Sequence, residues 1–83
     1  MEDCYLINLK IRYLSGFTDV IRGINVKDTI KTIKNKYKAT SGISIESQVY
    51  IFNNQIMENS KTVEYYKLHN DSVVYILILS PMI

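Results

Sequence analysis

The segment DTIKTIKNKYKATSGISIESQVYIF, residues 28–52, decides the fold because it contains both ends of one helix and leads into a strand. Thr29 is a favoured N-cap residue type, and Asp28 places a negative charge at the positive end of the helix dipole. Apolar side chains then recur at helical spacing: Ile30, Ile33 and Tyr37. Gly42 is the residue type that ends helices in a left-handed conformation. We therefore predict a helix over residues 30–40 with one apolar face.

The chain before this helix alternates apolar and polar residues, which is the pattern of half-buried strands. Residues 5–13 place every second side chain on one face: Tyr5, Ile7, Leu9, Ile11 and Tyr13. Ser15-Gly16 signals a turn, so residues 18–26 are predicted to form the second strand of a hairpin. The alternation breaks at Arg22-Gly23, where we expect a β-bulge.

The chain after the helix contains three further strand signals. We predict a strand at 48–52 (QVYIF), a strand of two or three residues within 55–57, and one turn of 3₁₀ helix at 63–66. Residues 72–79 (SVVYILIL) are apolar on both faces, which indicates a central strand. The predicted core packs the apolar helix face against the strands and is completed from the later segments: Leu9, Ile11, Tyr50, Leu68, Val74 and Ile76.

Composition bounds the function. A chain of 83 residues is one small domain, and 47% hydrophobic residues fit a globular fold. The single cysteine, Cys4, allows no internal disulfide and no cysteine-rich metal or cluster site. The longest apolar run, 73–79, is too short to cross a bilayer. We expect an intracellular protein, cytoplasmic or nuclear, with no membrane contact, no cofactor and no enzymatic activity.

Two polar features are weaker signals. A row of helix lysines could bind phosphate, but it is more often a solvated face: Lys27, Lys31, Lys34 and Lys38. No aromatic residues interleave with them and the net charge is only +2, so we expect no nucleic-acid partner. His69 has no ligand or catalytic partner at suitable spacing, and we interpret it as a surface loop residue.

The order of elements and several short motifs resemble the ubiquitin family. The matching stretches are DTI at 28–30, SGI at 41–43, QVYIF at 48–52, ME at 57–58, EYYKL at 64–68 and SVVYILIL at 72–79. The match needs no gap from Asp28 to the C-terminus. The resemblance implies an α+β, ubiquitin-like β-grasp, a mixed sheet with one packed helix. The domain would span residues 1–83, with 1–6 as a short N-terminal extension.

The resemblance also implies individual roles. Tyr66 would be a buried tyrosine whose hydroxyl bonds the backbone amide of Glu58, and Lys34 would be half-buried. Ubiquitin is bound through an apolar patch on the open face of its sheet. Carried over by position, that patch is Leu14, Ile51, Tyr75 and Leu77, with Val49, Val73 and Leu79 at flanking positions where ubiquitin is polar. We predict these seven residues as a protein-binding site.

The end of the chain departs from the family pattern. Conjugation requires a tail that ends in two glycines, because only glycine lets an activating enzyme approach the backbone so closely. The corresponding residues here are Met82 and Ile83, preceded by Pro81. We therefore expect a non-conjugated ubiquitin-like interaction module or ubiquitin mimic. Its partner would be a protein that binds ubiquitin, or a second copy in a homodimer.

Other readings remain open at this point. The alternative is a ubiquitin-like modifier or sulfur-carrier-type protein whose Gly-Gly is absent from this chain. A third is a β-grasp adaptor that binds a small GTPase or a sister domain through charge. The apolar outer face could also be covered by the N-terminal extension or by the tail.

Overall fold

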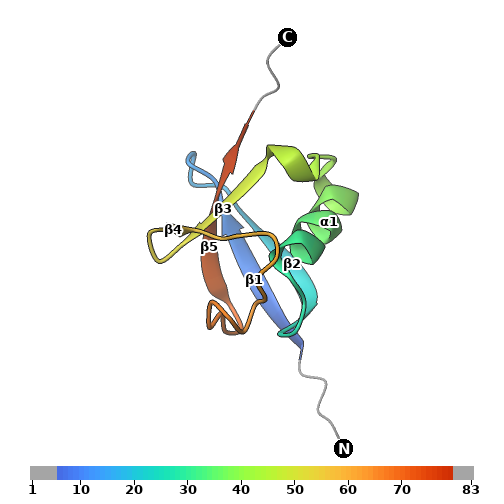
Figure 1. The fold of residues 1–83 in the computed structure, drawn as a ribbon. Coiled ribbons are helices and arrows are strands. Elements are labelled where there is room, and N and C mark those ends of the chain that lie inside the picture. Colours follow the sequence, from blue (N-terminus) through green and yellow to red (C-terminus); the bar gives the residue numbers. More distant parts are fainter. Residues whose placement is uncertain (1–5, 80–83) are drawn as a thin grey trace, which may run out of the picture.

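One helix packs on one face of a five-stranded mixed sheet in the computed structural model, which describes residues 6–79 (Figure 1). The elements in chain order are β1 Leu6–Arg12, β2 Thr18–Asn25, α1 Ile30–Ser41, the 3₁₀ helix η1 Ile45–Ser47, β3 Gln48–Phe52, β4 Gln55–Ile56 and β5 Ser72–Ile78. The sheet order is β2-β1-β5-β3-β4, and β1 and β5 are its parallel pair. The predicted α+β β-grasp with a central last strand is confirmed.

The ends of α1 are those that the sequence predicts. The Thr29 hydroxyl accepts a hydrogen bond from the Thr32 amide at 3.2 Å. Gly42 has a left-handed φ of 81°, and its N–H donates to the Lys38 carbonyl at 2.8 Å. The helix is one residue longer than predicted, since it includes Ser41.

The first hairpin also follows the prediction, including its irregularity. The Gly16 amide donates to the Tyr13 carbonyl at 2.9 Å and closes the turn. The register pairs Ile7 with Ile24 and then Leu9 with Ile21, so that two residues of β2 oppose one residue of β1. The extra residue is the bulge expected at Arg22-Gly23. Tyr5, predicted at the start of this strand, lies outside the described residues.

One local prediction is wrong. Residues 63–66 form turns and not a 3₁₀ helix, and the 3₁₀ helix lies at Ile45–Ser47. The backbone near 63–66 makes long-range bonds instead, because the Val63 amide donates to Asp28 and the Glu64 amide to Val26. The short strand predicted within residues 55–57 is confirmed as β4, and Met57 directly after it turns its side chain into the core.

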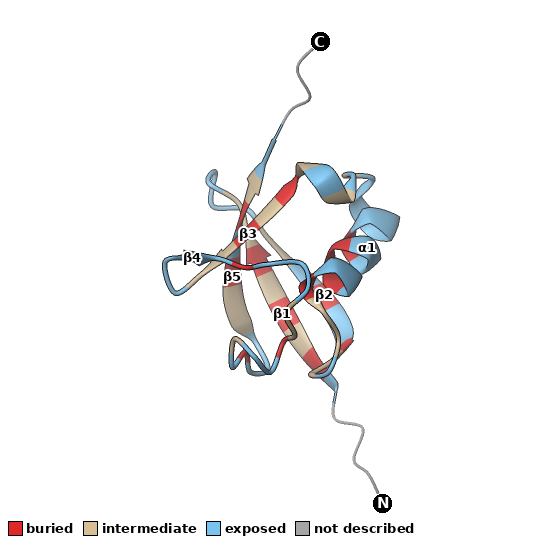
Figure 2. Cartoon of the chain, in the orientation of Figure 1, coloured by how far each residue is buried: buried red, intermediate tan, exposed pale blue. Residues whose placement is uncertain are grey.

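The core lies between α1 and the strands, where the buried positions of the ribbon gather (Figure 2). Every predicted core residue is buried, and so are five residues outside that core list: Ile7, Ile21, Ile24, Met57 and Val63. Gln48 is buried as well, but its side-chain nitrogen Nε2 donates to the backbone carbonyls of Lys34 and Ile43, both at 3.0 Å. A buried polar side chain with its partners in place costs little stability.

The hydrogen bond that the family resemblance implies for Tyr66 is confirmed, although Tyr66 is only partly buried, and Lys34 is buried more completely than the resemblance implies. The Glu58 amide donates to the Tyr66 hydroxyl at 2.8 Å. Lys34 is buried along its stem, and its ammonium group donates to the Asn59 side-chain oxygen at 2.7 Å. This bond ties α1 to the long loop before β5, so Lys34 belongs to the framework of the fold.

The helix lysines offer a matched test of this packing. Lys31 is exposed, so Lys31→Ala should change the free energy of unfolding by less than ~0.5 kcal/mol. Lys34→Ala removes a buried stem and the bond to Asn59, and should destabilise the domain by about 1–2 kcal/mol. Urea titration of both variants measures the difference. Equal effects, or unfolding of Lys31→Ala, would show that the orientation of α1 is wrong.

Alkaline pH should destabilise the fold through two core tyrosines. Burial raises the pKa of Tyr37 and of Tyr50 above the ordinary 10, and for Tyr37 hydrogen bonds with Tyr13 and Asp19 raise it further. The unfolded chain loses these protons above pH 10 while the folded chain keeps them, so stability falls as pH rises through that range. Burial lowers the pKa of Lys34, and the unfolded chain then binds the extra proton. Through Lys34 alone, stability therefore rises with pH below the ordinary lysine value, and this opposes the loss of stability that the two tyrosines cause at slightly higher pH.

Tyrosinate absorbance, followed with circular dichroism along a pH titration, measures this coupling. We expect part of the tyrosine signal to rise only with loss of secondary structure, and Tyr37→Phe to reduce that part. Complete titration of all tyrosines in a still folded protein would contradict the assignment.

Candidate protein-binding face of the sheet

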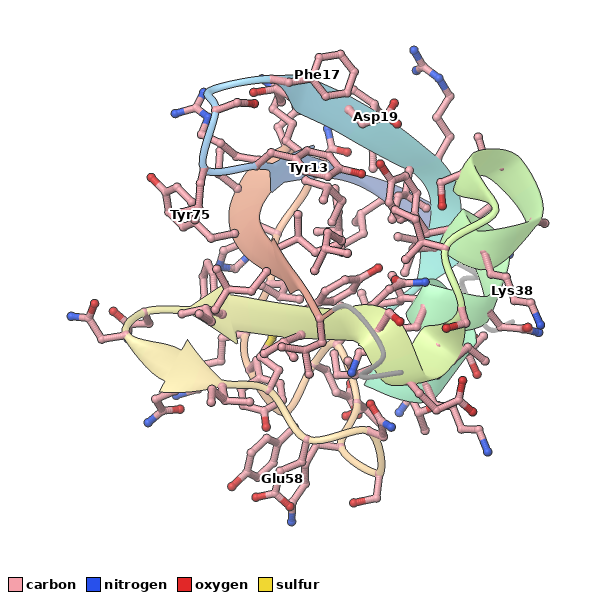
Figure 3. All side chains as sticks on the ribbon, turned by 90° about the horizontal axis from the view of Figure 1, so that it is seen from above. Tyr13, Phe17, Asp19, Lys38, Glu58 and Tyr75 are labelled. Atoms are coloured by element: carbon pink, nitrogen blue, oxygen red, sulfur yellow. The ribbon has the colours of Figure 1, made fainter. Side chains whose placement is uncertain are left out.

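The sheet has one face under α1 and one open face. Along β5 the side chains alternate, because Val74 and Ile76 are buried while Tyr75 is 46% exposed. Tyr75 points away from the sheet on the side opposite α1 (Figure 3). Outward and inward residues therefore separate along this central strand as the family resemblance implies.

Strand register brings the outward apolar residues together. In the antiparallel pair of β3 and β5, Val49 lies opposite Leu77, and Ile51 lies opposite Tyr75. Directly paired residues share a face of the sheet and their side chains touch. With Val73, two positions before Tyr75 on the same strand, they form one block that we call the sheet-face patch: Val49, Ile51, Val73, Tyr75 and Leu77.

Ile56 extends the patch onto β4, and the sequence analysis did not include it. Ile56 pairs with Ile51 and is 66% exposed. The sequence does contain a signal for this pairing, because Asn53-Asn54 is a two-residue turn of the type that sets hairpin register. Both asparagines have positive φ, 56° and 65°, as such turns require. Counting outward from this turn pairs residue 56 with residue 51.

Leu14 and Leu79 are less closely connected to the patch. Leu14 is 84% exposed in the β1–β2 turn. It lines a shallow hollow with Leu77 and four other residues: Tyr13, Ser15, Ile76 and Ile78. This hollow joins Leu14 to the end of β5. Leu79 follows β5, is exposed and donates its amide to the Ser47 carbonyl at 2.8 Å, but it does not line the hollow.

A basic border runs along one side of the patch. Lys10 pairs with Val73 and Arg12 pairs with Tyr75 across the parallel strands β1 and β5. Arg12 is held by a hydrogen bond from its Nε to the Thr18 hydroxyl at 3.2 Å. An apolar centre with a charged rim is the usual anatomy of a protein interface.

The other chemistry-bearing residues do not assemble into a site in the described part of the chain. Within residues 6–79, no three histidine, cysteine, aspartate or glutamate side chains come together as metal ligands would. His69 is exposed, as predicted, and Ser72 accepts a hydrogen bond from its backbone amide. None of the helices described is both long and apolar enough to span a membrane.

Sheet order, helix placement and the apolar outer face together define a ubiquitin-like β-grasp domain. The family model described as the Ubiquitin family matches residues 7–80, and the chain belongs to that family. Domains of this family are generally non-enzymatic.

Proposed function

We propose that this protein is a non-conjugated ubiquitin-like interaction module, or a ubiquitin mimic, that binds proteins through the sheet-face patch. The observation that carries the proposal is the pairing of Val49 with Leu77 and of Ile51 with Tyr75, which makes four outward apolar side chains contiguous. The proposal assigns no catalytic step to the domain.

Exposure supports this role for the patch. The core already uses the inward neighbours Tyr50, Val74 and Ile76, while the outward side chains keep surface open to solvent: Tyr75 is exposed, and the other four patch residues are partly exposed. Contiguous apolar surface of this kind generally marks a partner surface. Tyr75 presents an aromatic ring with a polar hydroxyl, which suits the centre of an interface.

The partner that fits is a protein with an apolar centre and an acidic edge. The acidic edge would face Lys10 and Arg12, which border the patch along β1. Two partners are considered: a protein that normally binds ubiquitin, and a second copy of this chain, which supplies an apolar centre but carries the same basic border. Either would meet the domain in an intracellular compartment, where we place it.

The test is association measured with the whole chain. Sedimentation velocity from micromolar to millimolar protein detects self-association, and binding to immobilised ubiquitin-binding domains detects the other partner class. We expect association in at least one arm and its loss in a patch variant. Association that is indifferent to the patch would contradict the proposal.

A further inference from the structure

The turn between β1 and β2, residues 13–17, forms one side of the hollow that adjoins the sheet-face patch. Tyr13, Leu14 and Ser15 line the hollow from the turn, and Leu77 belongs to both the hollow and the patch. The conformation of the turn therefore decides whether Leu14 and Leu77 present one continuous apolar surface.

Most hydrogen bonds of this turn stay within the hairpin. The Tyr13 amide donates to the Phe17 carbonyl and the Gly16 amide donates to the Tyr13 carbonyl, both at 2.9 Å. The rings of Tyr13 and Phe17 also pack together, with centroids 5.6 Å apart. Within residues 6–79, one hydrogen bond joins residues 13–17 to an element outside the hairpin, and the Tyr13 side chain makes it.

Tyr13 reaches α1 through a chain of three side chains. Its side chain extends from the hairpin toward α1 (Figure 3), and its hydroxyl bonds to the Tyr37 hydroxyl. The Tyr37 hydroxyl donates to Oδ2 of Asp19 at 2.9 Å. A hydroxyl has one proton and a carboxylate only accepts, so Tyr13 is the donor to Tyr37. Asp19 is itself held in place, because its Oδ1 accepts the Val20 amide at 2.9 Å.

Tyr37 lies at the centre of this chain and away from any binding partner. Its side chain is 2% exposed and belongs to the face of α1 that packs on the core. It does not line the hollow beside the patch. Linked hydrogen bonds of this kind strengthen one another, so loss of the Tyr37 hydroxyl releases both of its neighbours.

We infer that Tyr37 is a positioning residue for binding at the sheet-face patch: together with Asp19 it holds Tyr13, and so keeps Leu14 beside Leu77 in the free domain. This inference rests on the proposed function. A domain whose turn takes the binding conformation only part of the time binds more weakly in proportion to that fraction. A turn that is released to an occupancy of about 0.1–0.3 would weaken association by about three- to tenfold.

The test compares Tyr37→Phe with the matched variant Tyr50→Phe. Both variants keep a buried ring and lose one hydroxyl, but the Tyr50 hydroxyl donates to the Gln48 side chain at 2.7 Å and has no bond to the turn. In the free whole chain, we expect the backbone order parameters of residues 14–16 to fall from about 0.85 to below about 0.6 in Tyr37→Phe alone. Asp19→Ala keeps both tyrosine rings and removes the acceptor, and should loosen the turn in the same way.

Association is then measured in the arm that binds the wild-type chain. It should weaken by about three- to tenfold in Tyr37→Phe and stay within about twofold of the wild type in Tyr50→Phe. Unchanged order parameters, a loosened turn that associates like the wild type, or equal effects of the two tyrosine variants would overturn the inference. A wild-type chain that does not associate would contradict the proposed function instead, and the order parameters alone would then decide whether Tyr37 holds the turn.

Discussion

Ile51→Arg should leave the β-grasp folded and weaken association through the sheet-face patch by ~2 kcal/mol or more, the scale of an interface hot spot. Ile51 lies at the middle of the patch, since it pairs with Tyr75 on one side and with Ile56 on the other. An arginine there brings a charge into a surface that must lose water on binding. Circular dichroism measures the fold, and sedimentation or surface binding measures association.

A matched control keeps this result interpretable. Tyr65 is 58% exposed in the loop before β5, so Tyr65→Arg adds the same charge outside the sheet and should leave association unchanged. Two outcomes would contradict the account. If Ile51→Arg unfolds, the side chain is needed inside the monomer. If it folds and associates like the wild type, the sheet-face patch is not the binding surface.

Leu9→Ala should destabilise the domain by about 3 kcal/mol, within the usual ~2–5 kcal/mol for truncating a buried leucine. Leu9 is fully buried on β1, and its strand pairs with β2 and with the central strand β5. Truncation leaves a cavity that the surrounding sheet cannot easily close. Urea or thermal unfolding measures the loss.

Leu14→Ala is the matched control for this core prediction. Leu14 carries the same side chain in the β1–β2 turn but is 84% exposed, so its truncation should change stability by less than ~0.5 kcal/mol. The same variant should reduce association, because Leu14 shares a hollow with Leu77. A stability loss like that of Leu9→Ala would contradict the described position of the turn.

Local signals were sufficient for α1 and the first hairpin. The Thr29 cap, the Gly42 end and the bulge at Arg22-Gly23 each depend on a few neighbouring residues, and each appears as predicted. These patterns are legible in sequence because the side chains and backbone conformations that cause them are adjacent in the chain. Residues 72–79 are apolar on both faces, so it was the family resemblance that correctly separated Val74 and Ile76 from Tyr75.

Features that depend on long-range partners were missed. The loop at 63–66 could have closed on itself, but its amides bond to Asp28 and Val26 far back in the chain. Ile56 joins the patch only through its pairing with Ile51 on the neighbouring strand. Spacing along one strand indicates which side chains point to the open face of the sheet. It does not indicate which of them become neighbours across two strands.

The most direct test of the central claim is an amide-shift titration of the labelled whole chain, first with unlabelled chain and then with a ubiquitin-binding domain. The account predicts that in at least one titration the largest shifts fall on Val49, Ile51, Tyr75 and Leu77, while Lys31 and Lys38 on α1 stay unmoved. Shifts confined to α1, or no shifts in either titration, would contradict the claim that the sheet-face patch binds protein.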